Sequence, residues 1–382
     1  MKKKVVAVMM SLALCASLMM GCGSAETKEA AENTETEETV ETVEEEATEV
    51  EAEDETATEV EETTESEEVT DEEAVEETAE AAYEAVDINV GSLKGPTSIG
   101  LVYLMDQAKN GEAANNYNFT MATAADELLP KMISGEMDIV LVPANVASVL
   151  YNKTEGGVSV IDINTLGVLY MVSGDSSIQT MTDLKGKTIY LTGKGTTPDY
   201  VLQYLLTENG MTTDDVTLEY KSEATEVAAV LAENPDAIGV LPQPFVTAAC
   251  IQNEALTVVM DLNAEWNAVQ GEGGSSLVTG VTVVRNEFLA ENPEAVAKFM
   301  EEHEASAAYA NENVEAAAEL VAAEGIIEKA PVAAKAMPKC NITYIDGEDM
   351  KTALSGYLEV LFNQDASSVG GSLPADDFYY IQ

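Results

Sequence analysis

The chain has 382 residues, and its 70 acidic side chains outnumber 18 basic ones, with one histidine and four cysteines. Residues 23–86 hold 28 acids and one lysine, whereas residues 87–382 hold 42 acids and 14 bases and are long enough to bury a core. This balance argues against nucleic-acid binding, which needs a basic surface. The single histidine argues against a histidine-rich metal site and against catalysis by several histidines.

Residues 1–22 have the features of an export signal. Three lysines precede an apolar run of 16 residues at 5–20, which is short for a membrane-spanning helix. The segment ends in Leu-Met-Met-Gly-Cys at Cys22, which resembles the lipobox of bacterial lipoproteins. The resemblance implies that residues 1–21 are cleaved and that a lipid on Cys22 holds the protein at the extracytoplasmic face of the cell membrane. The alternative is an ordinary secretory leader with a chance cysteine.

Residues 22–86 consist mostly of Glu, Thr, Ala and Val, with one aromatic residue, Tyr83. Dense like charge with little apolar surface predicts a disordered, extended tether that holds the body away from the membrane. A calcium-binding or protein-docking tail is the alternative, although no EF-hand spacing favours it.

Beyond residue 87, short apolar runs alternate with helical patterns, which predicts an α/β fold with largely parallel strands. The predicted strands, each followed by a helix, are residues 88–93, 138–143, 188–191 and 237–242. The spacing from Thr97 to Pro143 is 46 residues and that from Thr197 to Pro242 is 45, so we expect two lobes of similar topology. Ligands of open α/β sheets bind beyond the carboxyl ends of the strands, and two such edges facing each other make a cleft.

The last third of the chain is predicted to return to the first lobe through a strand at 277–285 and then to become helical, at about 293–309 and 350–361. Cys250 and Cys340 match no metal-site spacing. In an exported protein they form either a disulfide or two buried free thiols, and the sequence leaves both alternatives open.

Three motifs resemble the solute-binding proteins of ABC importers, and most closely the branch named for sulfonate, nitrate and thiamine-pyrimidine binding. They are Gly-Pro-Thr-Ser at 95–98, Gly-Val-Thr-Val-Val-Arg at 280–285 and Glu-Asn-Pro-Glu at 291–294. The resemblance implies a bilobal fold like that of type II periplasmic binding proteins, with two hinge crossings and a solute held between the lobes. It also implies that a membrane permease with its ATPase recognises the closed form. We place the crossings near residues 172–187 and 261–277.

These crossings assign residues 87–174 and 278–382 to the first lobe and residues 175–277 to the second. We expect a monomeric binding protein without catalytic residues, metal or cofactor, because the sequence has no Cys/His cluster, Gly-x-Ser-x-Gly motif or phosphate-binding loop. The alternatives are an enzyme on the same scaffold, of the pyrimidine-synthesis or menaquinone-pathway type, or a surface sensor. His303 is expected to pack, on a helix surface or half-buried, rather than to catalyse.

The candidate ligand contacts are mostly polar residues at predicted strand ends and helix starts. They are Pro96, Thr97, Ser98, Asn145, Thr196, Thr197, Gln243, Trp266, Ser275 and Ser276. Amides and hydroxyls at helix N-termini suit negative or partially negative ligand atoms. Trp266 could stack on a flat solute, and the two serines follow a glycine-rich stretch that could line the cleft.

Each candidate has a structural alternative. Thr97 and Thr197 could simply cap helices, and because Thr197 precedes a proline it is the better cap, which leaves Thr196 as the freer donor. Asn145 and Gln243 could be turn residues, and Trp266 could be core packing. A neutral or weakly basic heterocycle and a sulfonate remain equally compatible with the site, and the sole arginine, Arg285, is left out of it.

Overall fold

The computed structural model describes residues 83–382. The predicted leader with its lipidation site Cys22, and the acidic segment up to residue 82, lie outside the described residues. Among residues 83–382, we find no helix with the length and apolar character needed to cross a bilayer.

The first sheet has six strands in the order β11-β4-β10-β3-β1-β2. These strands are β1 (Asp87–Leu93), β2 (Asn116–Ala122), β3 (Ile139–Pro143), β4 (Val158–Leu166), β10 (Val278–Arg285) and β11 (Ile342–Ile345). β1 pairs in parallel with β2 and β3, whereas β10 runs antiparallel between β3 and β4. Residues 139–142 of β3 are all 0% exposed, as expected of an apolar parallel strand covered on both faces.

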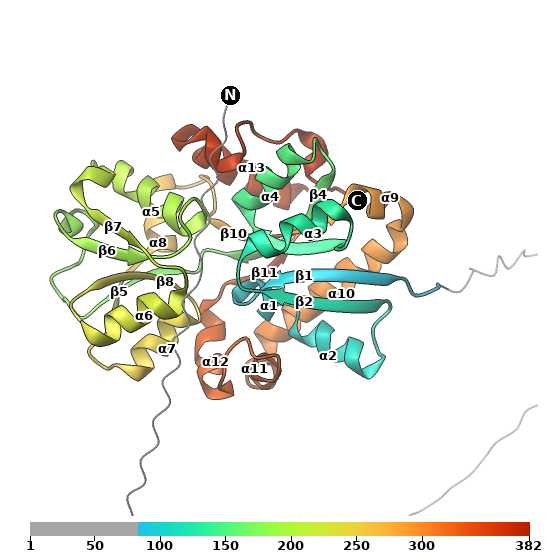
Figure 1. Ribbon diagram of the computed structural model, residues 1–382, viewed down its shortest axis with the longest axis horizontal. Helices are drawn as coiled ribbons and strands as arrows, with labels where there is room; N and C mark the ends of the chain where they lie inside the picture. The colour runs from blue at the N-terminus through green and yellow to red at the C-terminus, as the bar shows by residue number, and fades with distance from the viewer. Residues whose placement is uncertain (1–82) are drawn as a thin grey trace, which may run out of the picture. The chain divides into compact units, whose positions relative to one another are not determined.

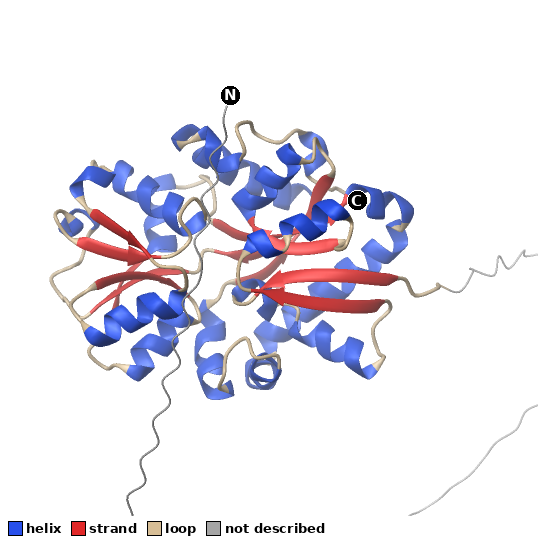
Figure 2. Cartoon of the chain, viewed as in Figure 1, coloured by secondary structure: helices blue, strands red, loops and turns tan. Residues whose placement is uncertain are grey.

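The second sheet has five strands in the order β7-β6-β8-β5-β9 and forms the other half of the molecule (Figure 2). These strands are β5 (Leu169–Ser173), β6 (Thr188–Leu191), β7 (Thr217–Tyr220), β8 (Ile238–Pro242) and β9 (Thr257–Asp261). β6 pairs in parallel with β7 and β8, and β5 runs antiparallel between β8 and β9. We call each sheet with its helices a lobe.

The two lobes repeat one strand arrangement. In each, the first of three parallel strands in chain order lies between the other two. The third parallel strand, β3 or β8, pairs on its other edge with an antiparallel strand, β10 or β5. Val90 of β1 pairs with Ile139 of β3, and Ile189 of β6 pairs with Ile238 of β8, so both registers span 49 residues. The predicted similarity of topology is confirmed.

Helices cover both faces of each sheet. The helices are α1 (Pro96–Ile99), α2 (Val102–Asn110), α3 (Leu129–Ser134), α4 (Ala144–Lys153), α5 (Thr197–Glu208), α6 (Ala224–Glu233), α7 (Phe245–Gln252), α8 (Leu262–Gln270), α9 (Asn286–Glu291), α10 (Pro293–Glu312), α11 (Val314–Ala323), α12 (Ala330–Ala336) and α13 (Gly347–Gln364). In the second lobe, α5 and α8 lie on one face of the sheet and α6 and α7 on the other (Figure 1). In the first lobe, α4 lies on one face, and α2 and α10 on the other (Figure 1).

The chain passes between the sheets twice, once between β4 and β5 and once between α8 and β10. The second passage, residues 271–277, lies within the predicted crossing. The first lies at residues 167–168, ahead of the predicted 172–187, because β5 pairs with β8 and β9. Residues 169–173 therefore belong to the second lobe, which corrects their assignment to the first. The apolar pattern of a strand indicates burial and does not reveal the sheet in which the strand pairs.

Helix α13 joins the lobes through a shared apolar core. It packs against α4, β4 and β10 of the first lobe and against α5 of the second. One continuous cluster includes Val142 of β3, Leu191 of β6 and Leu358 of α13, all 0% exposed. The predicted inward face of this final helix is confirmed, and the C-terminal segment is placed beside the carboxyl ends of both sheets' central strands.

The two remaining cysteines are free thiols, so of the two alternatives the disulfide is wrong. Cys250 is half-buried and Cys340 is buried. Burial raises the pKa of the Cys340 thiol to about 12, so this side chain is a neutral part of the core.

Candidate functional site

At the end of β1, the hydroxyls of Thr97 and Ser98 turn back onto the strand. Both donate hydrogen bonds to the Leu93 carbonyl oxygen, over 3.0 and 2.7 Å. Pro96 begins the four-residue helix α1, and neither hydroxyl caps it. Because both hydroxyl protons are engaged in this turn, Thr97 and Ser98 can offer a ligand only acceptor lone pairs.

Asn145 lies in the first turn of α4, at the carboxyl end of β3. Its Nδ2 donates to the Ser368 carbonyl over 3.2 Å and, from the first lobe to the second, to the Gly195 carbonyl over 3.5 Å. Carbonyls only accept, so they fix the orientation of the amide. The Oδ1 atom has no hydrogen-bond partner among residues 83–382.

At the start of α5, the roles expected of the two threonines are exchanged. Thr196 is the N-cap residue, and its hydroxyl donates to the Gly193 carbonyl over 2.7 Å. Thr197 is the first helical residue and Pro198 the second. Thr197 is buried, and its Oγ1 lacks a partner anywhere in the described part of the chain. Thr197, and not Thr196, is therefore the freer hydroxyl, because Pro198 occupies the second helical position rather than the first.

Gln243 follows β8 and occupies the position in the second lobe that corresponds to Asn145. Its backbone N–H donates to the Val168 carbonyl over 3.0 Å, at the first passage between the lobes, and its peptide bond to Pro244 is cis. Its Oε1 accepts hydrogen bonds from the backbone and the hydroxyl of Thr247, over 3.3 and 2.9 Å. Its buried Nε2 has no partner within the described residues, so the free group here is a donor.

Trp266 has the packing role that was the alternative to solute stacking. It is 0% exposed, and its ring packs against Tyr204 and Tyr357, with centroids 4.7 and 5.5 Å away. Its Nε1 donates to the Ser275 carbonyl over 2.7 Å. Ser276 is exposed, and the Ser275 hydroxyl donates to the Ser276 carbonyl over 3.2 Å. We leave these three residues out of the proposed site.

We call a buried side-chain nitrogen or oxygen with no hydrogen-bond partner among residues 83–382 an open atom. Three predicted contacts contain one, namely Asn145, Thr197 and Gln243. Five residues outside the predicted contacts also contain one. Thr279, Arg285 and His303 belong to β10 and α10 of the first lobe, whereas Tyr357 belongs to α13 and Ser368 to the short turn Ala366–Val369 that follows α13. The tyrosine hydroxyl on the predicted apolar face of the last helix was the available signal, since a buried hydroxyl needs a partner.

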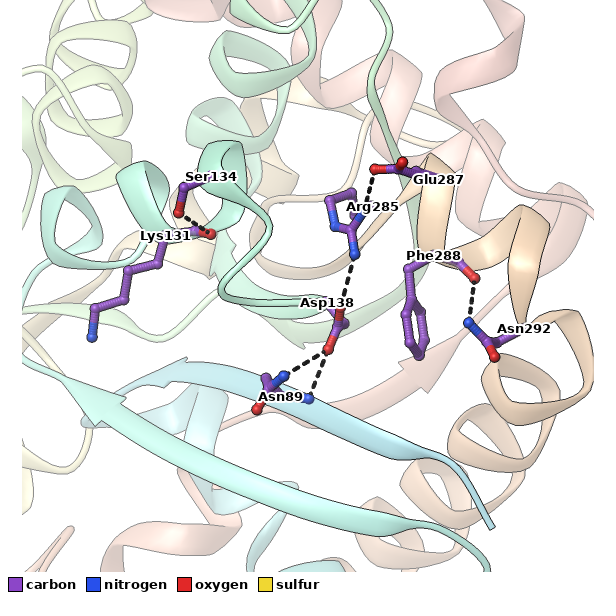
Figure 3. A network of polar contacts seen from close by, with 8 residues as sticks. All are labelled: Asn89, Lys131, Ser134, Asp138, Arg285, Glu287, Phe288 and Asn292. Carbon is purple, nitrogen blue, oxygen red and sulfur yellow. Dashed lines mark hydrogen bonds and ion pairs between the residues drawn. The ribbon is translucent and has the colours of Figure 1, made fainter. Parts of the chain in front are cut away.

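Arg285 lies at the opposite end of the first sheet from Asn145. Its guanidinium contacts Asp138 over 3.0 Å and Glu287 over 2.6 Å, and Asp138 also accepts from Asn89 (Figure 3). Asp138 precedes β3, whereas Asn145 follows it. The network therefore joins the amino end of β3 to β1 and β10, and the sole arginine has a structural role.

His303 is fully buried in α10, and not half-buried or on a helix surface as expected. Its Nδ1 lies 3.1 Å from the Asp162 carboxylate, which also accepts a hydrogen bond from the Thr282 hydroxyl over 2.7 Å. The pair lies in the core of the first lobe, and Asp162 is also 0% exposed. Within residues 83–382, no group of three or more His, Cys, Asp or Glu side chains is arranged to hold a metal ion.

Comparison with known proteins gives one family and a set of similar folds. Residues 156–317 match the model of the family described as NMT1/THI5 like. An ABC transporter protein of Parabacteroides distasonis has a TM-score of 0.64 at 24% identity, over 77% of this chain and 98% of that one. The periplasmic aliphatic sulphonate binding protein of Escherichia coli has a TM-score of 0.62 at 15% identity, over 77% and 96%. The resemblance predicted from the sequence is confirmed.

These structural matches establish a periplasmic-binding-protein fold. A Brucella abortus protein, provisionally named a binding protein, is 28% identical over 181 residues. That alignment spans 47% of this chain and 54% of the relative, so the chain spans about half the length of the curated relatives it matches. The similar proteins are named for binding and transport, which supports a binding role.

Proposed function

We propose that the protein is the solute-binding component of an ABC importer. In this proposal it captures a small organic solute between its lobes at the extracytoplasmic face of the membrane and delivers it to a permease with its ATPase. The observation that carries the proposal is the placement of open atoms on Asn145, Gln243 and Thr197, at strand ends and a helix start of both lobes. A buried polar atom without a partner is destabilising by about 1–3 kcal/mol, and a bound solute would supply the missing partners.

In this proposal, the structure is the closed form, in which the two lobes contact each other around the site. Each open atom has almost no contact with solvent, and Asn145 donates to Gly195 of the other lobe over 3.5 Å. A solute could enter only if this contact opened and the lobes moved apart about the two passages at 167–168 and 271–277. Hinge closure of this kind is a common response to a ligand. Lipid attachment at Cys22 and the acidic tether, which lie outside the described residues, are part of the proposal and would keep the binding protein near the permease.

A thermal-shift screen tests the binding role. The full-length protein is heated with ethanesulfonate, nitrate, cytosine or an amino-acid mixture, and each compound is recovered afterwards. Binding to the folded state alone stabilises it by about 2.7 kcal/mol when the free compound is at 100 times its Kd, so at least one compound should raise the Tm. Its unchanged recovery would distinguish a receptor from an enzyme. If no compound raises the Tm, the proposed solute classes are wrong.

The helix α4 offers a matched pair of variants for this screen. Asn145 and Asn152 both donate from Nδ2 to carbonyls of the C-terminal segment. The Oδ1 of Asn152 accepts from Ser372, whereas the Oδ1 of Asn145 is an open atom. Asn145→Ala should weaken the solute-induced Tm rise, and Asn152→Ala should retain it. Equal responses of the two variants would remove Asn145 from the site.

A further inference from the structure

The C-terminal segment contributes to a cluster of open atoms that the candidate contacts only partly cover. These atoms are Asn145 Oδ1, Thr197 Oγ1, Tyr357 OH and Ser368 Oγ. The four residues are 1%, 2%, 0% and 1% exposed. They come from α4, α5, α13 and the turn after α13, and α13 packs against each of the other three elements.

Two hydrogen bonds connect Asn145 to the turn that carries Ser368 and to the loop that precedes Thr197. Asn145 Nδ2 donates to the Ser368 carbonyl over 3.2 Å and to the Gly195 carbonyl, two residues before Thr197, over 3.5 Å. Burial raises the pKa of the Tyr357 hydroxyl, and the neighbouring Thr197 side chain partly offsets that rise, although no hydrogen bond of ordinary geometry joins them. The Tyr357 ring is held in place by Trp266, with centroids 5.5 Å apart.

A buried carboxylate lies in the first turn of α5, close to the cluster. Asp199, two residues after Thr197, is buried and accepts hydrogen bonds from the Gly195 N–H over 2.8 Å and from the Tyr220 hydroxyl over 2.7 Å. The nearest lysine in sequence, Lys194, is exposed and lies 5.2 Å from the Tyr220 ring centroid. In the described residues, no basic side chain bonds to any of the four members.

The hydrogen-bonding capacity of the four atoms restricts what can occupy the cluster. Asn145 Oδ1 can only accept, so an occupant must donate an N–H or O–H to it. The three hydroxyls can donate or accept, so the occupant can also present an acceptor. A sulfonate or nitrate has only acceptors at neutral pH. It would leave Asn145 Oδ1 unsatisfied and would enter a site with a neighbouring carboxylate and no cation.

We propose that Asn145, Thr197, Tyr357 and Ser368 form one polar subsite that binds an uncharged group carrying both donor and acceptor, such as a carboxamide or sulfonamide. The inference rests on the proposed binding function and refines it, because it names the chemical class of one part of the solute and adds two contacts from the C-terminal segment. The solute therefore differs in charge at this point from the sulphonate for which the Escherichia coli protein is named.

Two buried serines provide the variants that test this subsite. Ser148 of α4 donates to the Val369 carbonyl over 2.8 Å, whereas the adjacent Ser368 has an open hydroxyl. Ser148→Ala should lower the Tm of the full-length protein by about 2 °C, since it removes one of the two side-chain hydrogen bonds to the Val369 carbonyl, the other being donated by Asn152. Ser368→Ala and Tyr357→Phe should leave the Tm unchanged or raise it. If they lower it as much as Ser148→Ala does, their hydroxyls are satisfied within the fold and the subsite is refuted.

The ligand class is tested with two pairs of compounds of similar shape, ethanesulfonamide with ethanesulfonate and nicotinamide with nicotinate. The neutral member of at least one pair should raise the Tm of the unsubstituted protein more than its anion does. Ser368→Ala and Tyr357→Phe should reduce that rise by at least half, and Ser148→Ala should retain it. A larger rise with the anions, or none with either neutral compound at millimolar concentration, overturns the class assigned.

The two proposals fail in different ways. If any compound of the wider screen raises the Tm equally in the unsubstituted protein, Ser368→Ala and Tyr357→Phe, solute binding stands, and the cluster holds ordered water only. If no compound of either screen raises the Tm, the proposed function fails. The stability comparison among the three variants then still decides whether the hydroxyls of Ser368 and Tyr357 are satisfied within the fold.

Discussion

The two lobes have the same strand arrangement but treat the polar residues at their edges differently. In the first lobe, the Thr97 hydroxyl donates to the carbonyl of Leu93. In the second lobe, its counterpart Thr197 is buried with an open hydroxyl. α1 has four residues and closes against β1, whereas α5 has twelve and begins with a separate capping residue, Thr196.

The corresponding amides also differ. Asn145 of the first lobe has a free acceptor, and Gln243 of the second has a free donor. A repeated topology therefore fixes where polar residues lie, and the local hydrogen bonds decide which of their atoms remain available. A solute held between such edges would meet an acceptor on one side and a donor on the other, which favours a polar group with both functions.

The largest expected effect concerns the buried pair of Asp162 and His303 in the first lobe, since no pair of this kind occurs in the second lobe, residues 169–277. His303→Phe should lower the free energy of unfolding by about 3 kcal/mol, because it leaves the Asp162 carboxylate buried with the Thr282 hydroxyl as its remaining side-chain partner. Urea unfolding measures this. The double variant with Asp162→Leu should recover most of the loss, as apolar replacements of buried pairs often do. A single variant as stable as the unsubstituted protein contradicts the expectation.

The sequence predicted the strands and the shared topology of the two lobes better than it predicted the site. Apolar runs and their spacing located β3, β6, β8 and the C-terminal helix α13, because periodic burial is visible in the sequence. Which residues approach each other in space is not visible. The β5 pairing, the His303–Asp162 contact and the proximity of Ser368 to Asn145, 223 residues apart, depend on how the elements pack.

The site illustrates the same limit at single residues. Thr196 and Thr197 are adjacent, and a shift of one position in the helix start exchanged their roles. Trp266 has a flat aromatic ring that could stack on a solute, yet it packs against two tyrosines and is part of the core. Residue type identified the candidates. Only the coordinates reveal which of their atoms already have hydrogen-bond partners, and this difference separates Asn145, Thr197 and Gln243 from the rest.

The second expected effect contrasts the paired threonines directly. Thr97→Val should lower the free energy of unfolding by about 1 kcal/mol, since it removes one of the two side-chain hydrogen bonds to the Leu93 carbonyl and leaves only that from Ser98. Thr197→Val removes an open hydroxyl and should be neutral or slightly stabilising. For whichever solute binds, Thr197→Val should weaken affinity about tenfold, as loss of one good hydrogen bond does, and Thr97→Val less. Unfolding curves measure the stabilities, and titration calorimetry measures the affinities. If Thr197→Val is the less stable variant, or if Thr97→Val loses more affinity, the distinction between the lobes is contradicted.

The smallest expected effect concerns surface carboxylates, Asp175 of the second lobe and Glu127 of the first. The hydrogen bond from Lys187, and then those from Ser177, lower the pKa of Asp175 to about 2. This pKa lies below the ordinary value of about 3.9, so the interaction stabilises the fold above that pH and is lost as the pH falls towards 2. The stability difference between Asp175→Asn and the unsubstituted protein should therefore be present at neutral pH and vanish near the lower pKa.

Salt separates this carboxylate from its counterpart in the first lobe. The Thr123 hydroxyl and then two backbone N–H groups lower the pKa of Glu127, and no ion pair joins Glu127 to a basic side chain of residues 83–382. Where the Debye length shrinks to about 3 Å, at 1 M salt, the effect of Asp175→Asn should decrease because Lys187 is screened. The effect of Glu127→Gln should persist, because neutral hydrogen bonds are screened far less. Urea unfolding at low and high salt measures both effects. Equal salt responses would show that the Asp175 carboxylate, like that of Glu127, is stabilised by hydroxyl and backbone donors, here those of Ser177. The contrast between the two lobes would then not extend to their surfaces.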